Sequence, residues 1–387
     1  MASYFDHAAT TPMSLPAIEA FTEQIQQLGN PSSLHTQGRS VRKRVEEARE
    51  AIAQAAGASP SEVIFTGSGT ESNNLAIKGF YWKRLGEDKN RNVIVISAFE
   101  HHAILDPVEW LEAHEGALVI QVPVTRDGVV DLEALKDIVE KNRERIAVIA
   151  VMHSNNEVGT IQPITEVVAI AGDIPVHTDA VQSFGKVAFD FAELGVISAT
   201  ISGHKVGGPL GVAALLLRRG IDVTPILHGG GQERDIRSGT LNAPAIVSFA
   251  AAATDAQIHR EERYIYLREL RQYLIDSLTA VVPDIVVNGD VEPALPGIAN
   301  LTFPGTESDG LLLLLDAEGI ASSTGSACSA GVPRPSHVLL AMGLSERDAR
   351  SSLRFSLGIS NTRAEIDQLS SVIASVVERA RAALARQ

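Results

Sequence analysis

The sequence predicts an α/β fold in which helices cover both faces of a mostly parallel sheet. Short apolar runs rich in β-branched residues alternate with helix-length amphipathic segments over the first half of the chain. These runs are apolar throughout and do not alternate with polar residues, as is typical of strands buried on both faces. We therefore expect a large domain with a mixed, mostly parallel, seven-stranded sheet.

The strands of this sheet are expected at residues 63–66, 93–97, 118–124, 146–152, 176–178, 200–202 and 212–217. Open α/β sheets bind ligands at the carboxyl ends of their strands. Polar side chains lie at such ends, and we expect one site to include them: Thr66, Ser97, Ser154, Asp179 and Ser202.

A second, smaller α/β domain is expected after a long helical stretch from residue 243 to about 281. It has predicted strands at 298–303, 320–323 and 353–357, a helix at 310–318, and a final helix that begins with the capping box Thr362-Arg363-Ala364-Glu365. The sequence thus predicts a large domain of residues 13–260 and a small domain of residues 1–12 and 261–387.

Composition excludes several classes of function. The 387 residues include 33 Lys and Arg against 47 Asp and Glu, and a net charge of −14 disfavours direct binding to nucleic acid or to an anionic membrane. No apolar run is long enough to span a bilayer, and the first residues lack the pattern of a secretory signal, so we expect a cytoplasmic protein. The single cysteine, Cys328, cannot form an internal disulfide, and no motif with metal-ligand spacing predicts a metal site.

Lys205 and Asp179 are the most informative pair of residues. Lys205 follows an apolar strand in Ser202-Gly203-His204-Lys205, where desolvation turns a lysine amine into a nucleophile that forms Schiff bases. Asp179 ends the neighbouring strand, where a carboxylate can hold a pyridinium proton. Either residue alone is more often a surface charge or a turn residue. Together they predict pyridoxal 5'-phosphate.

A phosphate site is expected where the strand 63–66 meets a helix, at Thr66-Gly67-Ser68-Gly69-Thr70-Glu71-Ser72. The glycines allow close approach of the backbone, and free amides at the helix start, with the hydroxyls of Thr70 and Ser72, suit a phosphate. Ser202 and His204 lie next to Lys205 and can reach the same group. Without Lys205 and Asp179, this motif would be interpreted as an ordinary turn.

Other candidate residues have two interpretations. His101 follows the strand 93–97, where an imidazole can stack on a ring and exchange protons. Asn155, Asn156 and Gln182 either bind a ligand or form local turns. Arg354 interrupts a strand, and its partner is either a protein carboxylate or a substrate carboxylate. Cys328 lies among Gly, Ser and Ala residues, which favours an exposed, reactive thiol over a buried one.

The motifs together resemble those of the cysteine desulfurases, which are pyridoxal-phosphate-dependent transferases of the fold type I superfamily and class-V aminotransferase-like. The resemblance extends over nearly the whole chain. Within the family it is to the first group of desulfurases, which has a long catalytic loop. It is carried by Asp6-His7-Ala8-Ala9-Thr10-Thr11-Pro12, Gly29-Asn30-Pro31-Ser32-Ser33, Gly69-Thr70-Glu71-Ser72-Asn73-Asn74-Leu75-Ala76, Glu100-His101-His102-Ala103, Asn155-Asn156-Glu157-Val158-Gly159, His177-Thr178-Asp179-Ala180-Val181-Gln182, Ser202-Gly203-His204-Lys205, Arg237-Ser238-Gly239-Thr240, Gly325-Ser326-Ala327-Cys328 and Arg354-Phe355-Ser356-Leu357-Gly358.

The resemblance implies a role for each matching residue. Lys205 would bind the cofactor, Asp179 its pyridinium nitrogen and Gln182 its phenolic oxygen, while His101 would stack on it and act as acid or base. The phosphate would be bound by Gly69, Thr70, Ser202 and His204, and by Thr240 of the other subunit of a homodimer. Asn156 and Arg354 would bind the substrate, L-cysteine, and the catalytic Cys328 would accept its sulfur as a persulfide.

The family also implies a protein that takes the sulfur onward, such as an iron-sulfur scaffold or a tRNA-thiolation enzyme. Three alternatives remain open at this point. A related transaminase would not need Cys328, a selenocysteine lyase would favour selenium over sulfur, and a noncatalytic scaffold would need neither Lys205 nor Cys328.

Overall fold

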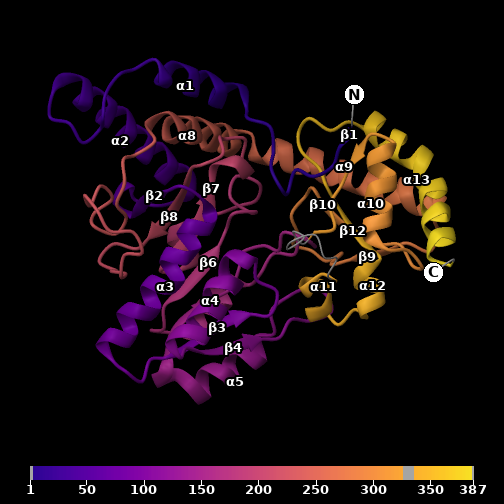
Figure 1. Ribbon diagram of the computed structural model, residues 1–387, viewed down its shortest axis with the longest axis horizontal. Helices are drawn as coiled ribbons and strands as arrows, with labels where there is room; N and C mark the ends of the chain where they lie inside the picture. Colours follow the sequence, from indigo (N-terminus) through magenta and orange to yellow (C-terminus); the bar gives the residue numbers. More distant parts are fainter. Residues whose placement is uncertain (1–2, 326–334, 386–387) are drawn as a thin grey trace.

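The computed structural model of the protein describes residues 3–325 and 335–385, which form two lobes connected by two consecutive helices (Figure 1). The predicted sulfur acceptor, Cys328, lies outside the described residues.

The larger lobe contains a seven-stranded sheet in the order β2-β8-β7-β6-β5-β3-β4. Its strands are β2 (Val63–Thr66), β3 (Val93–Ser97), β4 (Leu118–Val122), β5 (Ile146–Ala150), β6 (Val176–Asp179), β7 (Ser198–Ser202) and β8 (Ala213–Leu217). Strands β4, β3, β5, β6 and β7 run parallel to one another, whereas β8 is antiparallel to both β7 and β2. The predicted mixed, mostly parallel sheet is confirmed.

The predicted strand ends differ from the structure by a few residues. Strand β4 ends at Val122 and not at residue 124, because Pro123 has no N–H to donate to the sheet. Strand β6 extends to Asp179, so that the carboxylate belongs to the last residue of the strand.

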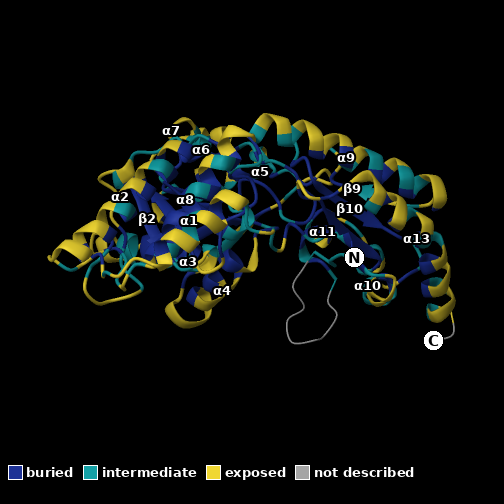
Figure 2. Ribbon diagram, turned by 90° about the horizontal axis from the view of Figure 1, so that it is seen from above, coloured by how far each residue is buried: buried dark blue, intermediate teal, exposed yellow. Residues whose placement is uncertain are grey.

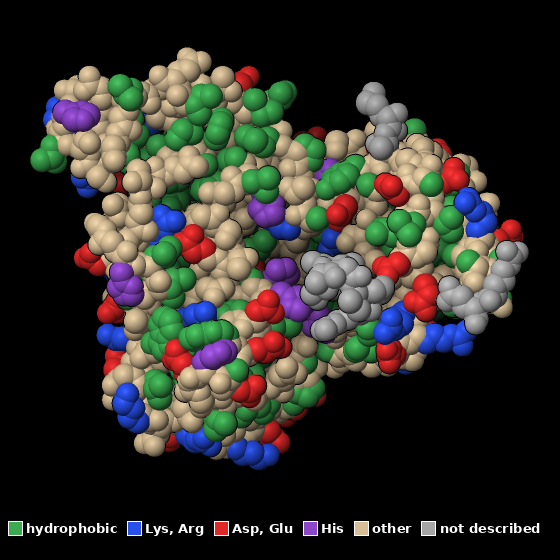
Figure 3. All heavy atoms as spheres, viewed as in Figure 1, with side chains coloured by type: hydrophobic (Ala, Val, Ile, Leu, Met, Phe, Trp, Pro, Cys, Tyr) green, Lys and Arg blue, Asp and Glu red, His purple; other side chains and the backbone are tan. Residues whose placement is uncertain are grey.

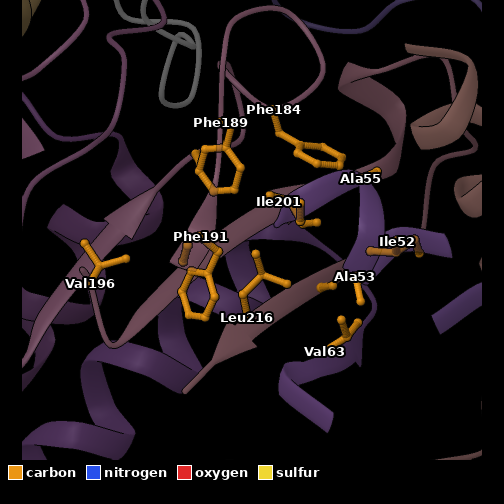
Figure 4. Packing of buried hydrophobic residues seen from close by; sticks show 14 of the residues in the cluster. Ile52, Ala53, Ala55, Val63, Phe184, Phe189, Phe191, Val196, Ile201 and Leu216 are labelled. Carbon is orange, nitrogen blue, oxygen red and sulfur yellow. The ribbon is translucent and has the colours of Figure 1, made fainter. Parts of the chain in front are cut away.

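Helices cover both faces of this sheet, which explains why its strands are apolar at successive positions. The helices of this lobe are α1 (Leu15–Ile25), α2 (Thr36–Ala56), α3 (Gly69–Glu87), α4 (His102–Glu115), α5 (Leu132–Asn142), α6 (Ile164–Ala171), α7 (Phe191–Leu194) and α8 (Ala243–Ile258). In β2, Val63 and Phe65 belong to a core with α2, α5, α6 and α8, while Ile64 belongs to a core with α3 and α4. Figure 4 shows Ile52 of α2 in the same cluster as Val63 and Leu216.

The smaller lobe has its own sheets and its own core. Strands β9 (Val286–Asn288), β10 (Ile298–Thr302) and β12 (Ser352–Ser356) form an antiparallel sheet, and β1 (Ser3–Tyr4) pairs in parallel with β11 (Ile320–Ala321). Its helices are α9 (Arg260–Val281), α10 (Ser308–Ala317), α11 (His337–Ala341), α12 (Glu346–Arg350) and α13 (Arg363–Leu384). The core of these elements includes Phe5 from the start of the chain. The predicted capping box of α13 is present at Thr362 and Glu365.

The helical stretch that begins at residue 243 divides at His259 into α8, which packs on the large sheet, and α9, which packs on α13. Figure 2 shows that buried residues fill the interior of each lobe, with exposed residues on the outer faces of the helices. The domain limits at residues 12/13 and 260/261 stay a prediction. In the described part of the chain, no helix is long and apolar enough to cross a membrane.

Candidate active site

A cavity of about 500 Å³ lies where the carboxyl ends of the large sheet meet the N-terminal segment and the smaller lobe. Histidine side chains gather between the two lobes (Figure 3). The cavity is lined by most of the predicted site residues, namely Gly69, Thr70, His101, Asn156, Asp179, Gln182, Ser202, His204, Lys205 and Arg354. Thr240 is exposed and is not among its lining residues. A cavity of this size accommodates a cofactor and a small substrate.

The predictions for Thr66, Ser97 and Ser72 are wrong, because these hydroxyls are used within the protein. Thr66 Oγ1 and Ser72 Oγ are hydrogen-bonded to each other at 2.7 Å, which fixes the turn between β2 and α3. Ser97 Oγ donates to Glu100 Oε1 at 2.5 Å. None of the three lines the cavity, whereas Ser154, Asp179 and Ser202 do.

Lys205 ends a short 3-10 helix, η3 (Gly203–Lys205), that follows β7 directly. Its Nζ donates to the main-chain oxygens of Ala8 at 2.5 Å and Ala9 at 2.7 Å. Burial, followed by repulsion from Arg354, lowers the pKa of Lys205 to about 8. A substantial fraction of this amine is therefore neutral near physiological pH, as a nucleophile or a base must be.

Asp179 is held in one orientation at the end of β6. Its carboxylate accepts hydrogen bonds from Asn73 Nδ2 at 2.6 Å and from the main-chain N–H of Val181 at 2.9 Å. Asn73 Oδ1 is 3.0 Å from His177 Nε2, and His177 Nδ1 is 2.8 Å from Ser198 Oγ. Since Asn73 directs its amino group to Asp179, its oxygen accepts from His177 Nε2–H. Burial lowers the pKa of His177 to about 3, so this ring is neutral.

His101 is the N-cap of α4, and its Nδ1 accepts a hydrogen bond from the main-chain N–H of Ala103 at 3.0 Å. The neutral ring therefore carries its proton on Nε2. Although the side chain borders the cavity, surrounding protein atoms lower the pKa of His101 by desolvation, against an opposing effect of Asp179. The ring is thus available as a proton acceptor near neutral pH.

The predicted phosphate end of the cavity combines a helix start with unpaired polar groups. Helix α3 begins at Gly69, and its N-cap Ser68 accepts the N–H of Glu71. The amides at the start of a helix have no partner within that helix. Ser202 Oγ is buried and has no hydrogen-bond partner among the described residues. His204 lines the same cavity and contacts Thr10 Oγ1 through Nδ1 at 3.3 Å.

Gln182 is held by two contacts that leave one amide hydrogen free. Its Nε2 donates to the main-chain oxygen of Ala8 at 2.8 Å, and its Oε1 accepts from Lys186 Nζ at 3.1 Å. Burial, followed by repulsion from Lys205, lowers the pKa of Lys186 to about 7. Lys186 is not among the predicted site residues, because nothing in the sequence pattern separates it from a surface lysine.

Arg354 has a protein carboxylate as its partner. Its Nη2 is 2.7 Å from Asp6 Oδ1, and its Nη1 donates to the main-chain oxygen of Asn156 at 2.9 Å. Its Nε is buried without a hydrogen-bond partner in the described structure. The neighbouring Asn155 is structural, since its Oδ1 accepts the main-chain N–H groups of Glu157 and Val158.

Comparison with known proteins identifies the family. Residues 3–369 match the model of the class-V aminotransferases. The chain is 51% identical to an "IscS-like cysteine desulfurase" of Mycobacterium tuberculosis over 384 residues, which are 98% of each chain. The chain belongs to the cysteine desulfurases of the class-V aminotransferase family. A solved structure of a NifS-like protein has a TM-score of 0.90 at 35% identity, covering 98% of this chain and 100% of the other. A structure titled "SspA in complex with cysteine" has a TM-score of 0.79 at 35% identity, covering 92% and 98%.

The enzyme depends on pyridoxal phosphate, as its family does. The cavity fits this cofactor in three respects. Asp179 presents a fixed carboxylate, Lys205 an amine of lowered pKa, and Ser202 a buried hydroxyl that lacks a partner. A buried hydroxyl is costly unless a ligand or water satisfies it, and a phosphate oxygen would do so.

Across residues 3–325 and 335–385, no group of three or more His, Cys, Asp or Glu side chains is arranged to hold a metal ion.

Proposed function

We propose that the enzyme removes the sulfur of L-cysteine, releases L-alanine and accepts the sulfur on Cys328 as a persulfide. One observation carries the proposal: a single cavity joins the Lys205 amine, the Asp179 carboxylate and Gly325. Cys328 follows Gly325 by three residues, and three residues of chain span at most about 11 Å. This length of chain is compatible with a thiol that reaches a substrate bound beside Lys205.

Different residues around the cavity would bind different parts of the cofactor. Asp179 would hold the proton of the pyridinium nitrogen, and the free hydrogen of Gln182 Nε2 would reach the phenolic oxygen. The amides of Gly69 and Thr70, with Ser202 and His204, would bind the phosphate. When bound, pyridoxal phosphate supplies an electron sink conjugated to the substrate's α-carbon.

Three side chains would act on the substrate before the sulfur moves. Arg354 would bind the carboxylate of L-cysteine, with the side chain of Asn156 beside it. The Lys205 amine would then take the α-proton, which its lowered pKa permits near neutral pH.

The sulfur transfer would proceed by attack of the Cys328 thiolate on the sulfur atom of the substrate. A bond between the two sulfur atoms forms while the carbon–sulfur bond of the substrate breaks, and its electron pair remains with the carbon skeleton. Protonation of that carbon yields L-alanine, so the substrate carbon is reduced as its sulfur is oxidised to the persulfide level. The neutral imidazole of His101 is the candidate acceptor of the Cys328 proton.

The working enzyme would be a homodimer that passes sulfur to a protein acceptor. Thr240 is exposed, as a residue that reaches a phosphate in the other subunit must be. Near α1, Leu15, Leu28 and Leu34 are 74%, 87% and 83% exposed, which favours a covered face in solution. The acceptor would serve iron-sulfur cluster assembly or a tRNA-thiolation pathway, and the cytoplasmic location stays a prediction.

Two substitutions test the proposal. Cys328→Ala should abolish formation of alanine from L-cysteine while the visible absorption of the bound cofactor is retained. Lys205→Ala should abolish turnover, and borohydride reduction of the wild-type enzyme should attach the cofactor to the peptide that contains Lys205. Full alanine formation by Cys328→Ala would show that this thiol is not the sulfur acceptor.

A further inference from the structure

Glu157 contacts both described ends of the segment that carries Cys328. Ser336 Oγ donates a hydrogen bond to Glu157 Oε2 at 2.5 Å. At the other end, a Cβ added to Gly325 would lie 2.7 Å from the same Oε2 atom, so only a glycine fits against this carboxyl group. Gly325 also has a φ of +89°, which favours glycine. A single carboxyl oxygen therefore contacts the chain just before residue 326 and just after residue 334.

The carboxyl group is itself mounted on a rigid part of the loop after β5. Glu157 is 1% exposed, and its main-chain N–H donates to Asn155 Oδ1 at 2.8 Å. Its main-chain oxygen accepts from Asn300 Nδ2 of the smaller lobe at 3.4 Å. A buried side chain on an immobilised backbone can set the position of what it contacts.

The same loop also contributes to the substrate side of the cavity. Residue 156 precedes Glu157, and its main-chain oxygen accepts from Arg354 Nη1. The main chains of Ser323 and Arg354 exchange two hydrogen bonds, of 2.7 and 3.2 Å. The substrate-binding arginine and the start of the Cys328 segment are thus linked through adjacent residues.

A second contact supports the far end of the segment. His337 follows Ser336 at the start of α11, and its Nε2 donates to the main-chain oxygen of Glu100 at 2.8 Å. Glu100 directly precedes His101, the candidate base for the thiol. The end of the segment is therefore tied to the residue next to that base as well as to Glu157.

We propose that Glu157 is a positioning residue that fixes the two ends of the Cys328 segment to one point beside the cavity. Its role is to set where the thiol starts its approach to the substrate sulfur, without taking part in the chemistry. This inference rests on the proposed function, in which Cys328 accepts the sulfur. Burial raises the pKa of Glu157, which favours a neutral carboxyl group that bonds to Ser336 without placing an unpaired charge in the interior.

The test separates sulfur transfer from the earlier chemistry on the same holoenzyme. Alanine formed from L-cysteine measures the complete reaction, which needs Cys328. Exchange of the α-hydrogen of L-alanine with deuterium from D2O needs the cofactor and Lys205 but no thiol, and mass spectrometry measures it.

Glu157→Ala should lower alanine formation by about 10- to 100-fold, the effect of misplacing a reacting group by about 1 Å. Deuterium exchange and the visible absorption band should stay close to the wild-type values. Glu157→Gln keeps the size of the side chain and an oxygen that accepts from Ser336, so it should restore alanine formation to within about threefold of wild type. Glu166→Ala, at an exposed position on α6, is the matched control and should leave both rates unchanged.

Ser336→Ala removes the same hydrogen bond from the other side and keeps the test decisive if Glu157→Ala does not fold. It should lower alanine formation by about 3- to 10-fold with exchange unchanged. Wild-type alanine formation in Glu157→Ala or Ser336→Ala, or an equal loss of exchange and alanine formation, would overturn the inference. Cys328→Ala distinguishes the two proposals. If Cys328→Ala loses alanine formation and Glu157→Ala does not, the proposed function stands and only the positioning role of Glu157 is rejected.

Discussion

The guanidinium group of Arg354 forms an ion pair of 2.7 Å with the carboxylate of Asp6, which belongs to the N-terminal segment and lines the same cavity as Lys205. The arginine side chain is 5% exposed and the aspartate side chain 22%. Two interpretations follow. Arg354 either joins the N-terminal segment to β12, or uses Asp6 as a counter-ion that orients it toward a substrate carboxylate.

Kinetics of two variants distinguish these interpretations. Arg354→Ala removes the group that would bind the substrate and should raise KM for L-cysteine at least about 30-fold, because loss of one partner from a buried charge pair costs about 2–5 kcal/mol. Asp6→Asn leaves the guanidinium in place and keeps a side-chain oxygen that can accept from it, so KM should change less than about tenfold. Equal KM values for the two variants would mean that Arg354 serves Asp6 and not the substrate.

Incorporation of the cofactor into the apoenzyme should follow the ionisation of Lys205. Only the neutral amine attacks an aldehyde, and the pKa of Lys205 is lowered to about 8. The rate of incorporation, followed by absorbance, should therefore rise with pH and level off above about pH 8. For a lysine with the ordinary pKa of 10.5, the rate would continue to rise up to about pH 10.5. Reaction of the cofactor with Nα-acetyl-lysine over the same pH range supplies the control. Arg354→Gln should move the midpoint upward, since repulsion from Arg354 contributes to the lowered pKa.

Glu100 should make stability depend on pH. Burial raises the pKa of this fully buried carboxyl group from 4.5 to about 8, so between these values the folded protein binds more protons than the unfolded chain. Its contribution to stability is complete below pH 4.5 and is lost as the pH rises to about 8, with a slope of at most about 1.4 kcal/mol per pH unit.

Glu100→Gln should therefore gain stability relative to wild type on going from pH 5 to pH 8. Unfolding by urea at both values measures this difference, in which contributions shared by the two proteins cancel. Glu109→Gln, at an exposed position on α4, should show no such trend. A constant difference between Glu100→Gln and wild type at the two pH values would contradict the raised pKa.

Asp179 and Asn73 should affect turnover to different extents. Asp179→Asn replaces a hydrogen bond to a charged group, worth about 1.5–3 kcal/mol, so kcat/KM should fall about 10- to 100-fold. Asn73→Ala leaves the carboxylate but removes one of its two donors, and a fall of about 3- to 10-fold is expected. A larger effect of Asn73→Ala than of Asp179→Asn would show that the carboxylate is not the group on which the cofactor depends.

The sequence predicted the class of fold because local patterns report it directly. Continuous apolar runs such as 93–97 and 146–152 indicate strands covered on both faces, and the capping box at Thr362 indicates the start of α13. The predicted strand ends were less accurate, as at Val122, because a strand ends where the neighbouring strand no longer provides hydrogen-bond partners. Short helices such as α11 and α12 contain too few residues to show the periodic spacing of apolar residues that indicates a helix.

Residue type and order along the chain therefore determined the fold class, the cofactor and most residues that line the cavity, since each lies next to a recognisable strand end or motif. Only the tertiary structure decided which polar groups are already paired. It assigned Thr66 to Ser72, Arg354 to Asp6, Asn73 to Asp179 and Glu157 to Ser336. Hydrogen bonds and desolvation depend on separations of a few ångströms between segments that are distant in sequence, and no local pattern contains those separations.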